Sequence, residues 1–178
     1  MSSGVDSLRF PIGHYQPPSP ISTDTRTAWM KSLAATADKL TEAVSGLSEE
    51  QLDTPYREGG WSVRQTVHHI ADSHMNSYVR FRLALTEENP TIKPYAEDRW
   101  AVLPDARHAN VELSLHLIEA LHARWVLLLK GISDADWQRT FIHPVSGQQT
   151  LENTLGLYAW HGEHHTAQIT RLRERMGW

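Results

Sequence analysis

The stretch GGWSVRQTVHHIADSH, residues 59–74, places the start of a helix directly before three histidines. Ser62 and Gln65 have the spacing of a capping box, in which both side chains satisfy backbone N–H groups of the first helical turn. Apolar residues then recur on one side of the chain as far as Leu85, which is typical of a helix with one buried face. The sequence therefore predicts an amphipathic helix from Ser62 to about Thr86.

Similar periodicity predicts three further helices, over residues 22–45, 111–130 and 150–175. Leu113, Leu117, Leu121, Trp125 and Leu128 mark the apolar stripe that we assign to the third helix of the chain. Four long helices, two of them joined by a long connection, pack most simply as a four-helix bundle. We therefore expect an all-α fold.

The segments between and before these helices have their own composition. Residues 1–21 contain four Pro and no helical period, so we expect an extended arm laid on the body. Residues 89–109 form a long connection without periodicity, of a length that is often functional, and are our candidate for a pocket wall. A small hairpin is expected around Ser146 and Gly147, within residues 139–149.

Composition excludes several classes of function. The chain has 178 residues, the length of one domain, and no Cys, which removes thiol nucleophiles, iron–sulfur clusters and Cys-ligated zinc. A net charge of −4 gives no electrostatic reason to expect nucleic acid or an anionic membrane as a partner. No apolar run is long enough to span a membrane, and the N-terminus lacks the pattern of a signal peptide.

Two of the 11 histidines fall on the apolar stripe of the helix over 150–175. His161 and His165 are one turn apart, so their side chains lie one above the other and point into the bundle. Two stacked core imidazoles need partners, and a divalent cation would take one nitrogen from each. Two ordinary core histidines would show the same spacing, so the pair alone leaves both interpretations open.

A third ligand has to come from another helix, and the helix over 62–86 offers three candidates. His74 lies on its apolar stripe, His69 on a flanking stripe of small polar residues, and His68 on the opposite flank. Periodicity does not choose among them, although the small residues beside His69 would leave room for a metal. Three imidazoles with a vacant fourth position are typical of catalytic zinc sites.

Residues 59–74 and the stretch YAWHGEHHTAQI, residues 158–169, resemble the second-helix and fourth-helix motifs of the DinB superfamily. The segments FPIG (10–13), EQLDTPYR (50–57) and RMGW (175–178) are similar to its YfiT subfamily of metal-dependent hydrolases. The resemblance covers the whole chain, and it implies a single domain over 1–178, with the arm over 1–21 and the bundle over 22–178. It also implies one divalent metal ion, Zn²⁺ or Ni²⁺, on His69, His161 and His165, in a cytoplasmic homodimer.

The reaction that the resemblance implies is hydrolysis of a small-molecule substrate by a metal-activated water. One alternative is a metal-dependent thiol S-transferase that uses bacillithiol or a similar low-molecular-weight thiol. A second alternative is a metal-binding stress protein without catalytic activity. The sequence contains no nucleophile motif or nucleotide-binding fingerprint that would point to another class.

Several other residues have a structural interpretation that we favour over a functional one. We expect His164 and Glu163 on the surface, Gln168 as a helix-packing amide, and Trp61, Trp125 and Trp160 in the core or at an interface. Asp72 lies well away from His69 on the helical wheel, so we do not expect it to orient that ring. For Arg80 and Arg82, a role with an anionic substrate and a solvated helix face are equally consistent with the sequence.

Overall fold

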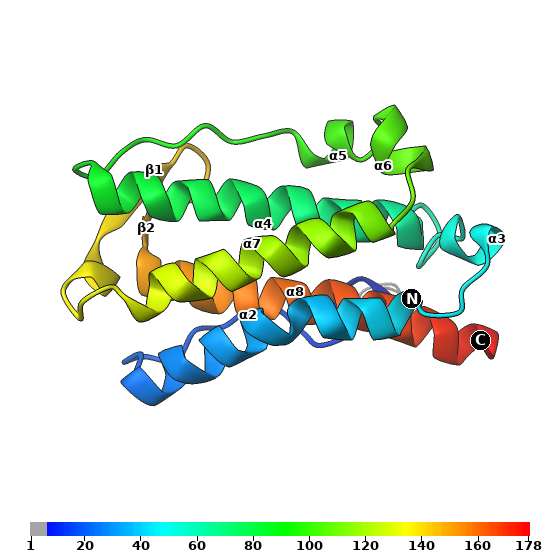
Figure 1. Cartoon of the computed structure of the whole chain (residues 1–178), viewed down its shortest axis with the longest axis horizontal. Helices are drawn as coiled ribbons and strands as arrows, with labels where there is room; N and C mark the ends of the chain where they lie inside the picture. The colour runs from blue at the N-terminus through cyan, green and yellow to red at the C-terminus, as the bar shows by residue number, and fades with distance from the viewer. Residues whose placement is uncertain (1–6) are drawn as a thin grey trace.

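The computed structural model describes residues 7–178 and has four long helices that pack side by side (Figure 1). These are α2 (Thr23–Val44), α4 (Val63–Thr86), α7 (Glu112–Lys130) and α8 (Leu151–Met176). The four-helix bundle predicted from the sequence is confirmed. The first six residues of the predicted arm lie outside the described residues.

Two pairs of helices run in opposite directions in the bundle. α2 and α8 are parallel to each other, whereas α4 and α7 run the other way (Figure 1). α2 and α4 each pack against both α7 and α8. Because α4 and α7 are parallel neighbours, the chain must return along the whole bundle between them. This return explains the length of the connection over residues 87–111.

Short elements occupy the connections. α3 (Glu49–Leu52) follows α2, while α5 (Glu97–Trp100) and α6 (Pro104–His108) lie in the long connection, for which the sequence predicts no regular structure. The 3₁₀ helix η1 (Asp136–Gln138) precedes an antiparallel hairpin of β1 (Thr140–His143) and β2 (Gly147–Thr150). The predicted hairpin is therefore present, and an isolated bridge joins Thr91 of the long connection to Ile142 of β1.

Side-chain caps fix where the long helices start. Ser62 accepts a hydrogen bond from the backbone N–H of Gln65, and the Gln65 side chain accepts one from the Ser62 backbone, so the predicted capping box is formed. Ser22 and Thr150 cap α2 and α8 in the same position. These caps satisfy N–H groups that have no partner inside the helix.

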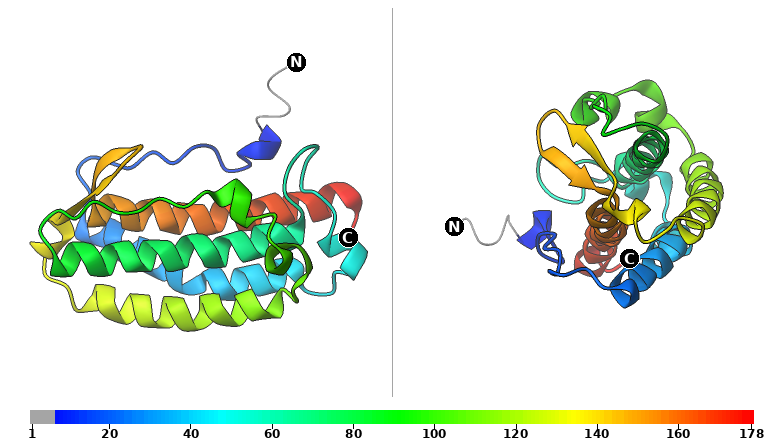
Figure 2. Two further views of the ribbon diagram at one scale, coloured as in Figure 1. Left: turned by 90° about the horizontal axis from the view of Figure 1, so that it is seen from above. Right: turned by 90° about the vertical axis from the view of Figure 1, so that its left-hand side faces the viewer.

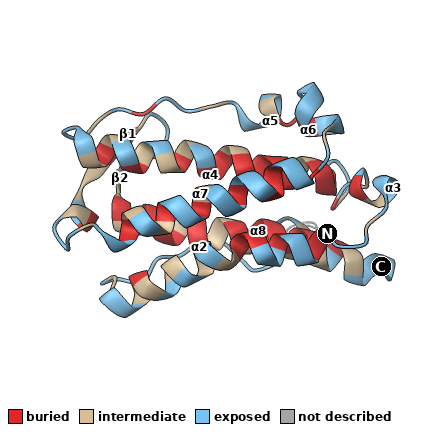
Figure 3. Cartoon of the chain, in the orientation of Figure 1, coloured by how far each residue is buried: buried red, intermediate tan, exposed pale blue. Residues whose placement is uncertain are grey.

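The inner faces of the helices form the core (Figure 3). For α7 the predicted apolar face is wrong at Leu113 and Leu117, which are 66% and 43% exposed, whereas Trp125 is buried as predicted. The buried face of α7 instead carries Leu115, Ile118, His122, Trp125 and Leu129. Leucines occur on both sides of this helix, so periodicity alone selected the outer stripe.

The arm lies against the outside of α8 (Figure 2). The hydroxyl group of Tyr15 donates to the backbone carbonyl of Asn153, and a Cβ on Gly156 would lie 2.3 Å from that hydroxyl oxygen. Glycine at this position therefore lets the arm approach the helix backbone closely. Among the residues described, no helix combines the length and apolar character needed to cross a lipid bilayer.

Candidate metal centre

Three histidines from two neighbouring helices meet at one point of the bundle. His69 lies near the start of α4, and His161 and His165 lie one turn apart on α8. Their candidate ligand nitrogens lie within 4.8 Å of one another, and Nε2 of His69 is 3.2 Å from Nε2 of His161. The antiparallel packing of α4 and α8 therefore brings together residues that are far apart in the sequence.

This arrangement fits a divalent cation. Two nitrogens bound to one tetrahedral Zn²⁺ at about 2.1 Å lie roughly 3.4 Å apart, which is close to the observed separation of the two Nε2 atoms. Two ring nitrogens that point at each other would otherwise need a shared hydrogen, since two lone pairs repel. The donor set is all nitrogen, which suits zinc and nickel better than magnesium or calcium.

Gln168, one turn after His165, determines which nitrogen of that histidine is free. Oε1 of Gln168 lies 2.9 Å from Nδ1 of His165, and because an amide oxygen only accepts, Nδ1 must carry the hydrogen. Nε2 of His165 then keeps its lone pair for a ligand. Nε2 of Gln168 donates to the carbonyl of Arg9 at 2.8 Å, which fixes the orientation of the amide.

Burial keeps these imidazoles neutral, the form in which histidine binds a metal. Desolvation, followed by the neighbouring charge of His164, lowers the pKa of His69 to about 4. Desolvation and the adjacent histidines hold the pKa of His161 and His165 well below the ordinary value. All three rings therefore offer a lone pair at neutral pH.

The cluster opens into a cavity of about 340 Å³. Trp61 and Trp160 form part of its wall, and the Trp61 ring centroid is 4.5 Å from that of His69. Charged residues of both signs complete the lining: Arg9, Arg57, Glu97 and Asp98. A small polar molecule could therefore reach the histidines through this opening.

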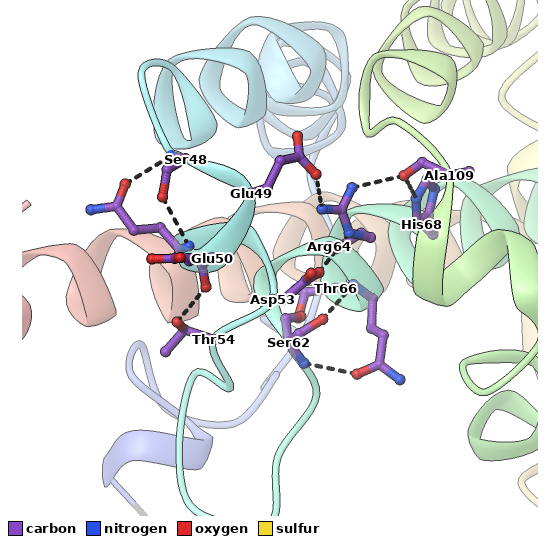
Figure 4. Close-up of polar contacts among 12 residues, drawn as sticks. Ser48, Glu49, Glu50, Asp53, Thr54, Ser62, Arg64, Thr66, His68 and Ala109 are labelled. Atoms are coloured by element: carbon purple, nitrogen blue, oxygen red, sulfur yellow. Dashed lines mark hydrogen bonds and ion pairs between the residues drawn. The ribbon is translucent and has the colours of Figure 1, made fainter.

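Arg64 anchors the first turn of α4 through several hydrogen bonds (Figure 4). Its guanidinium group donates to Asp53 at 2.7 Å, to Glu49 at 2.5 Å and to the carbonyl of Ala109 at 2.9 Å, while only 3% of the residue is exposed. These bonds tie α3 and the end of the long connection to the first turn of α4. His69 lies just over one turn further along the same helix.

The structure separates the three candidates on α4. His68 points away from the cluster, because its Nδ1 lies 2.7 Å from Oγ of Ser114. Its Nε2 lies 3.2 Å from the carbonyl of Ala109 (Figure 4). His74 is fully buried, and its Nε2 lies beside Nδ1 of His161. His74 therefore does not face the point where the three candidate ligand nitrogens meet. Of the three, only His69 belongs to the group that could hold a cation.

Other sequence-based expectations have mixed outcomes. The expectation that His164 lies on the surface is wrong, since it is 5% exposed, lines the cavity and stacks on Trp160. Trp125 is a core residue as expected, whereas Trp61 and Trp160 line the cavity. Glu163 lies on the outer face, where it pairs with Lys39.

The long connection and the two arginines of α4 are also placed by the structure. Glu97 and Asp98 of α5 line the cavity beside the histidines, so the connection contributes to the pocket wall as expected. Arg80 lines an adjoining cavity and contacts the Tyr158 hydroxyl, while Arg82 packs on Tyr78 at the surface. Among the described residues, no hydrogen bond joins Asp72 to His69, in line with the expectation.

The sequence analysis missed Gln168 and His122 as partners of the site. Gln168 falls three residues after His165, a spacing that places two side chains on one face of a helix. His122 falls on the buried stripe of α7, four residues after Ile118 and three before Trp125. Both signals were present in the sequence, but only the packing shows which neighbours these side chains meet.

The fold and the site together define a four-helix bundle with a cluster of three histidines suited to one metal ion. The chain belongs to the DinB superfamily, whose family model matches residues 32–169. It is 52% identical to a protein of Bacillus cereus (strain 03BB102) named "Putative metal-dependent hydrolase", over 98% of this chain and 100% of the relative. A Bacillus anthracis protein (strain CDC 684 / NRRL 3495) with the same name is equally similar over the same shares of both chains.

Two solved structures share the fold. YfiT from Bacillus subtilis, described as a probable metal-dependent hydrolase with an unusual four-helix bundle topology, is 51% identical, with a TM-score of 0.95 over 97% of this chain and 99% of YfiT. TT2238, described as a four-helix bundle protein, is 22% identical with a TM-score of 0.55, over 86% of this chain and 100% of its own. The second similarity concerns the fold alone.

Proposed function

We propose that the protein is a metal-dependent hydrolase in which His69, His161 and His165 hold one divalent cation, Zn²⁺ or Ni²⁺. The observation that carries this proposal is the convergence of three neutral imidazoles on one point at the floor of a cavity. The names of the relatives from Bacillus cereus and Bacillus subtilis support the same class of reaction. We further propose that residues 1–178 act as one domain, because the arm and α8 contribute to the same cavity.

A divalent cation on three histidines lowers the pKa of a bound water toward neutrality, which supplies a nucleophile at physiological pH. The chain's own residues prepare the site. Gln168 fixes the tautomer of His165, Trp61 shields the edge of His69, and the charged side chains at the opening can bind polar parts of a substrate. The size of the cavity is suited to a small molecule rather than to a polymer.

Elemental analysis of the purified protein tests the metal site. We expect one zinc or nickel per chain in the wild type, and none in His165→Ala. The matched control is His116→Ala, since His116 lies on the exposed outer face of α7 and should leave the metal content unchanged. Full metal content in His165→Ala would overturn the assignment of the ligands.

A screen with small esters and amides, with and without added thiols, tests the reaction. Hydrolysis that requires the metal and no thiol supports the proposal. Products that form only when a low-molecular-weight thiol such as bacillithiol is supplied would replace hydrolysis with thiol transfer. A metal that has no exchangeable water, in a protein without turnover, would support the non-catalytic alternative.

We also propose that the protein is a homodimer through the outer face of α7. Leu113, Leu117 and Leu127 fall on one side of this helix and are 66%, 43% and 70% exposed. An apolar stripe of this kind favours burial against another surface. Light scattering after gel filtration should give twice the chain mass for the wild type and the monomer mass for Leu117→Lys; a monomeric wild type would overturn this proposal.

A further inference from the structure

A row of imidazoles continues from the candidate metal centre into the core. Nδ1 of His161 is 3.1 Å from Nε2 of His74, and Nδ1 of His74 is 2.8 Å from Nε2 of His122. The row therefore crosses from α8 through α4 to α7. His74 and His122 are 0% and 1% exposed, so water does not compete for these contacts.

This row divides the apolar core into two parts. Ile70 and Ile118 belong to one cluster of buried residues, and Trp125 and Tyr158 belong to the other. His74, His122 and His161 lie between them in the sequence of each helix. A polar layer inside a core is unfavourable unless each polar atom has a partner, so the contacts along the row are what make this layer tolerable.

The order of donors and acceptors in the row follows from the chemistry of neutral imidazole, which has one N–H donor and one acceptor nitrogen. If Nε2 of His161 keeps its lone pair for a cation, Nδ1 carries the hydrogen and donates to Nε2 of His74. Nδ1 of His74 then carries a hydrogen and donates to Nε2 of His122. One choice at His161 thus sets the tautomers of all three rings.

The row ends inside the protein. Within the described part of the chain, Nδ1 of His122 has no partner with hydrogen-bond geometry, although the backbone of Leu33 lies close enough to influence this ring. A path for protons to solvent would need an exit at this end, and a nearly fully buried ring offers none. The arrangement suits the orientation of a ligand rather than proton transport.

We propose that His74 is a positioning residue that fixes His161 as an Nε2 ligand, and that His122 holds His74 in the tautomer this requires. The inference rests on the proposed metal site, to which it adds two residues from the core. Partners of this kind set both the ring orientation and the donor strength of a metal-bound histidine. Neither residue touches the cavity that a substrate would enter.

Metal affinity of His74→Phe tests the proposal. Phenylalanine fills the space but accepts no hydrogen bond, so we expect Zn²⁺ and Co²⁺ to bind about 10-fold to 100-fold more weakly, with an altered Co²⁺ absorption spectrum. His74→Gln retains an acceptor oxygen and should recover part of the affinity. The control is His68→Phe, which removes a buried histidine of the same helix that faces Ser114 instead, and it should bind metal like the wild type.

Nitrogen NMR of histidine-labelled wild type keeps the proposal testable if a variant does not fold. In the zinc-loaded protein, we expect hydrogens on Nδ1 of His161, His74 and His122. A hydrogen on Nε2 of His74, or a folded His74→Phe with wild-type metal affinity, would overturn the proposal. Failure of the wild type to bind metal at all would instead overturn the proposed function, so the two failures are distinguishable.

Discussion

Nδ1 of His165 and Oε1 of Gln168 lie 2.9 Å apart on the same face of α8. Nε2 of the Gln168 amide donates to the backbone carbonyl of Arg9, and it also lies 3.2 Å from Nε2 of His164. One side chain thus connects a candidate ligand, a second cavity histidine and the N-terminal arm. The arm is therefore attached at the site itself and not only along the outside of the bundle.

We expect Gln168→Leu to weaken Zn²⁺ binding by about 10-fold, because His165 loses the acceptor that holds its tautomer. The same substitution should release the arm, since the Arg9 carbonyl loses its donor. Competition with a chromophoric chelator measures the affinity, and the rate of trypsin cleavage after Arg9 measures the release.

The matched control is Gln148→Leu, which alters an exposed glutamine of the β1–β2 hairpin. It should change neither measurement. If Gln168→Leu binds zinc as tightly as the wild type, the hydrogen bond does not contribute to the ligand's orientation.

The indole ring of Trp61 should report metal binding directly. Its centroid lies 4.5 Å from that of His69 and 6.4 Å from that of His165. A paramagnetic ion such as Co²⁺ or Ni²⁺ bound between these rings should quench the emission of Trp61 strongly. We expect titration with either ion to lower the fluorescence of the wild type, and Trp61→Phe to lose most of this response.

Trp137→Phe serves as the comparison, because Trp137 is buried beside the hairpin and lines none of the site. This variant should keep the quenching. Because Trp160 also lines the cavity, the decisive variant is Trp61→Phe combined with Trp160→Phe, and a full response in that double variant would place the metal elsewhere in the protein.

The sequence predicted the helices and two of the three candidate ligands because both depend on local patterns. Capping residues such as Ser62 act within one turn, and the spacing of His161 and His165 is a property of one helix. Local sequence patterns do not decide which of His68, His69 and His74 is the third candidate ligand. That choice depends on which neighbour each ring faces: α7 for His68, α8 for His69, and the core between them for His74.

The resemblance to the DinB superfamily selected His69 where periodicity could not. Neither the resemblance nor the periodicity indicated that His122 contacts His74. The apolar stripe predicted for α7 did not include His122. Leu113 and Leu117 made the outer side of α7 as apolar as the inner side, so hydrophobicity did not discriminate between them. The packing of α7 against both α2 and α4 resolves this ambiguity.

Buried neutral histidines should make the metal-free protein less stable in mild acid. Burial, partly opposed by the backbone of Leu33, lowers the pKa of His122 to about 4. An unfolded histidine titrates near 6.5, so between these values the unfolded chain binds a proton that the folded chain does not. The free energy of unfolding therefore falls as the pH drops from 6.5 toward 4, by up to about 1.4 kcal/mol per pH unit for this group.

Urea unfolding with a chelator present, at about pH 7.5 and about pH 5, measures this effect. His122→Phe should show a shallower dependence on pH than the wild type, whereas Gln148→Leu, which changes an exposed residue and no titratable group, should show the same dependence. Equal slopes for the wild type and His122→Phe would mean that His122 takes up a proton as easily in the folded protein as in the unfolded chain.

Gly162, which follows the candidate ligand His161, packs closely against Thr36 of α2. A Cβ at this residue would lie 2.8 Å from Cγ2 and 2.9 Å from Oγ1 of Thr36, and Thr36 is 2% exposed. The hydroxyl of Thr36 donates to the backbone carbonyl of Ser32 at 3.1 Å, which holds this buried side chain in place. Overpacking of this kind costs about 1–3 kcal/mol, against a gain of roughly 1 kcal/mol from the better helix propensity of Ala.

We therefore expect Gly162→Ala to lower the free energy of unfolding by about 1 kcal/mol and to weaken zinc binding, since a shift of α8 displaces His161. Gly131→Ala is the control, because the nearest atom to its added Cβ would be 3.5 Å away, at ordinary contact distance. Adding Thr36→Ala to Gly162→Ala removes both clashing atoms and should restore stability and metal affinity together. If stability returned in the double variant while zinc binding stayed weak, the spacing of α2 and α8 would support the fold without setting the position of the ligand.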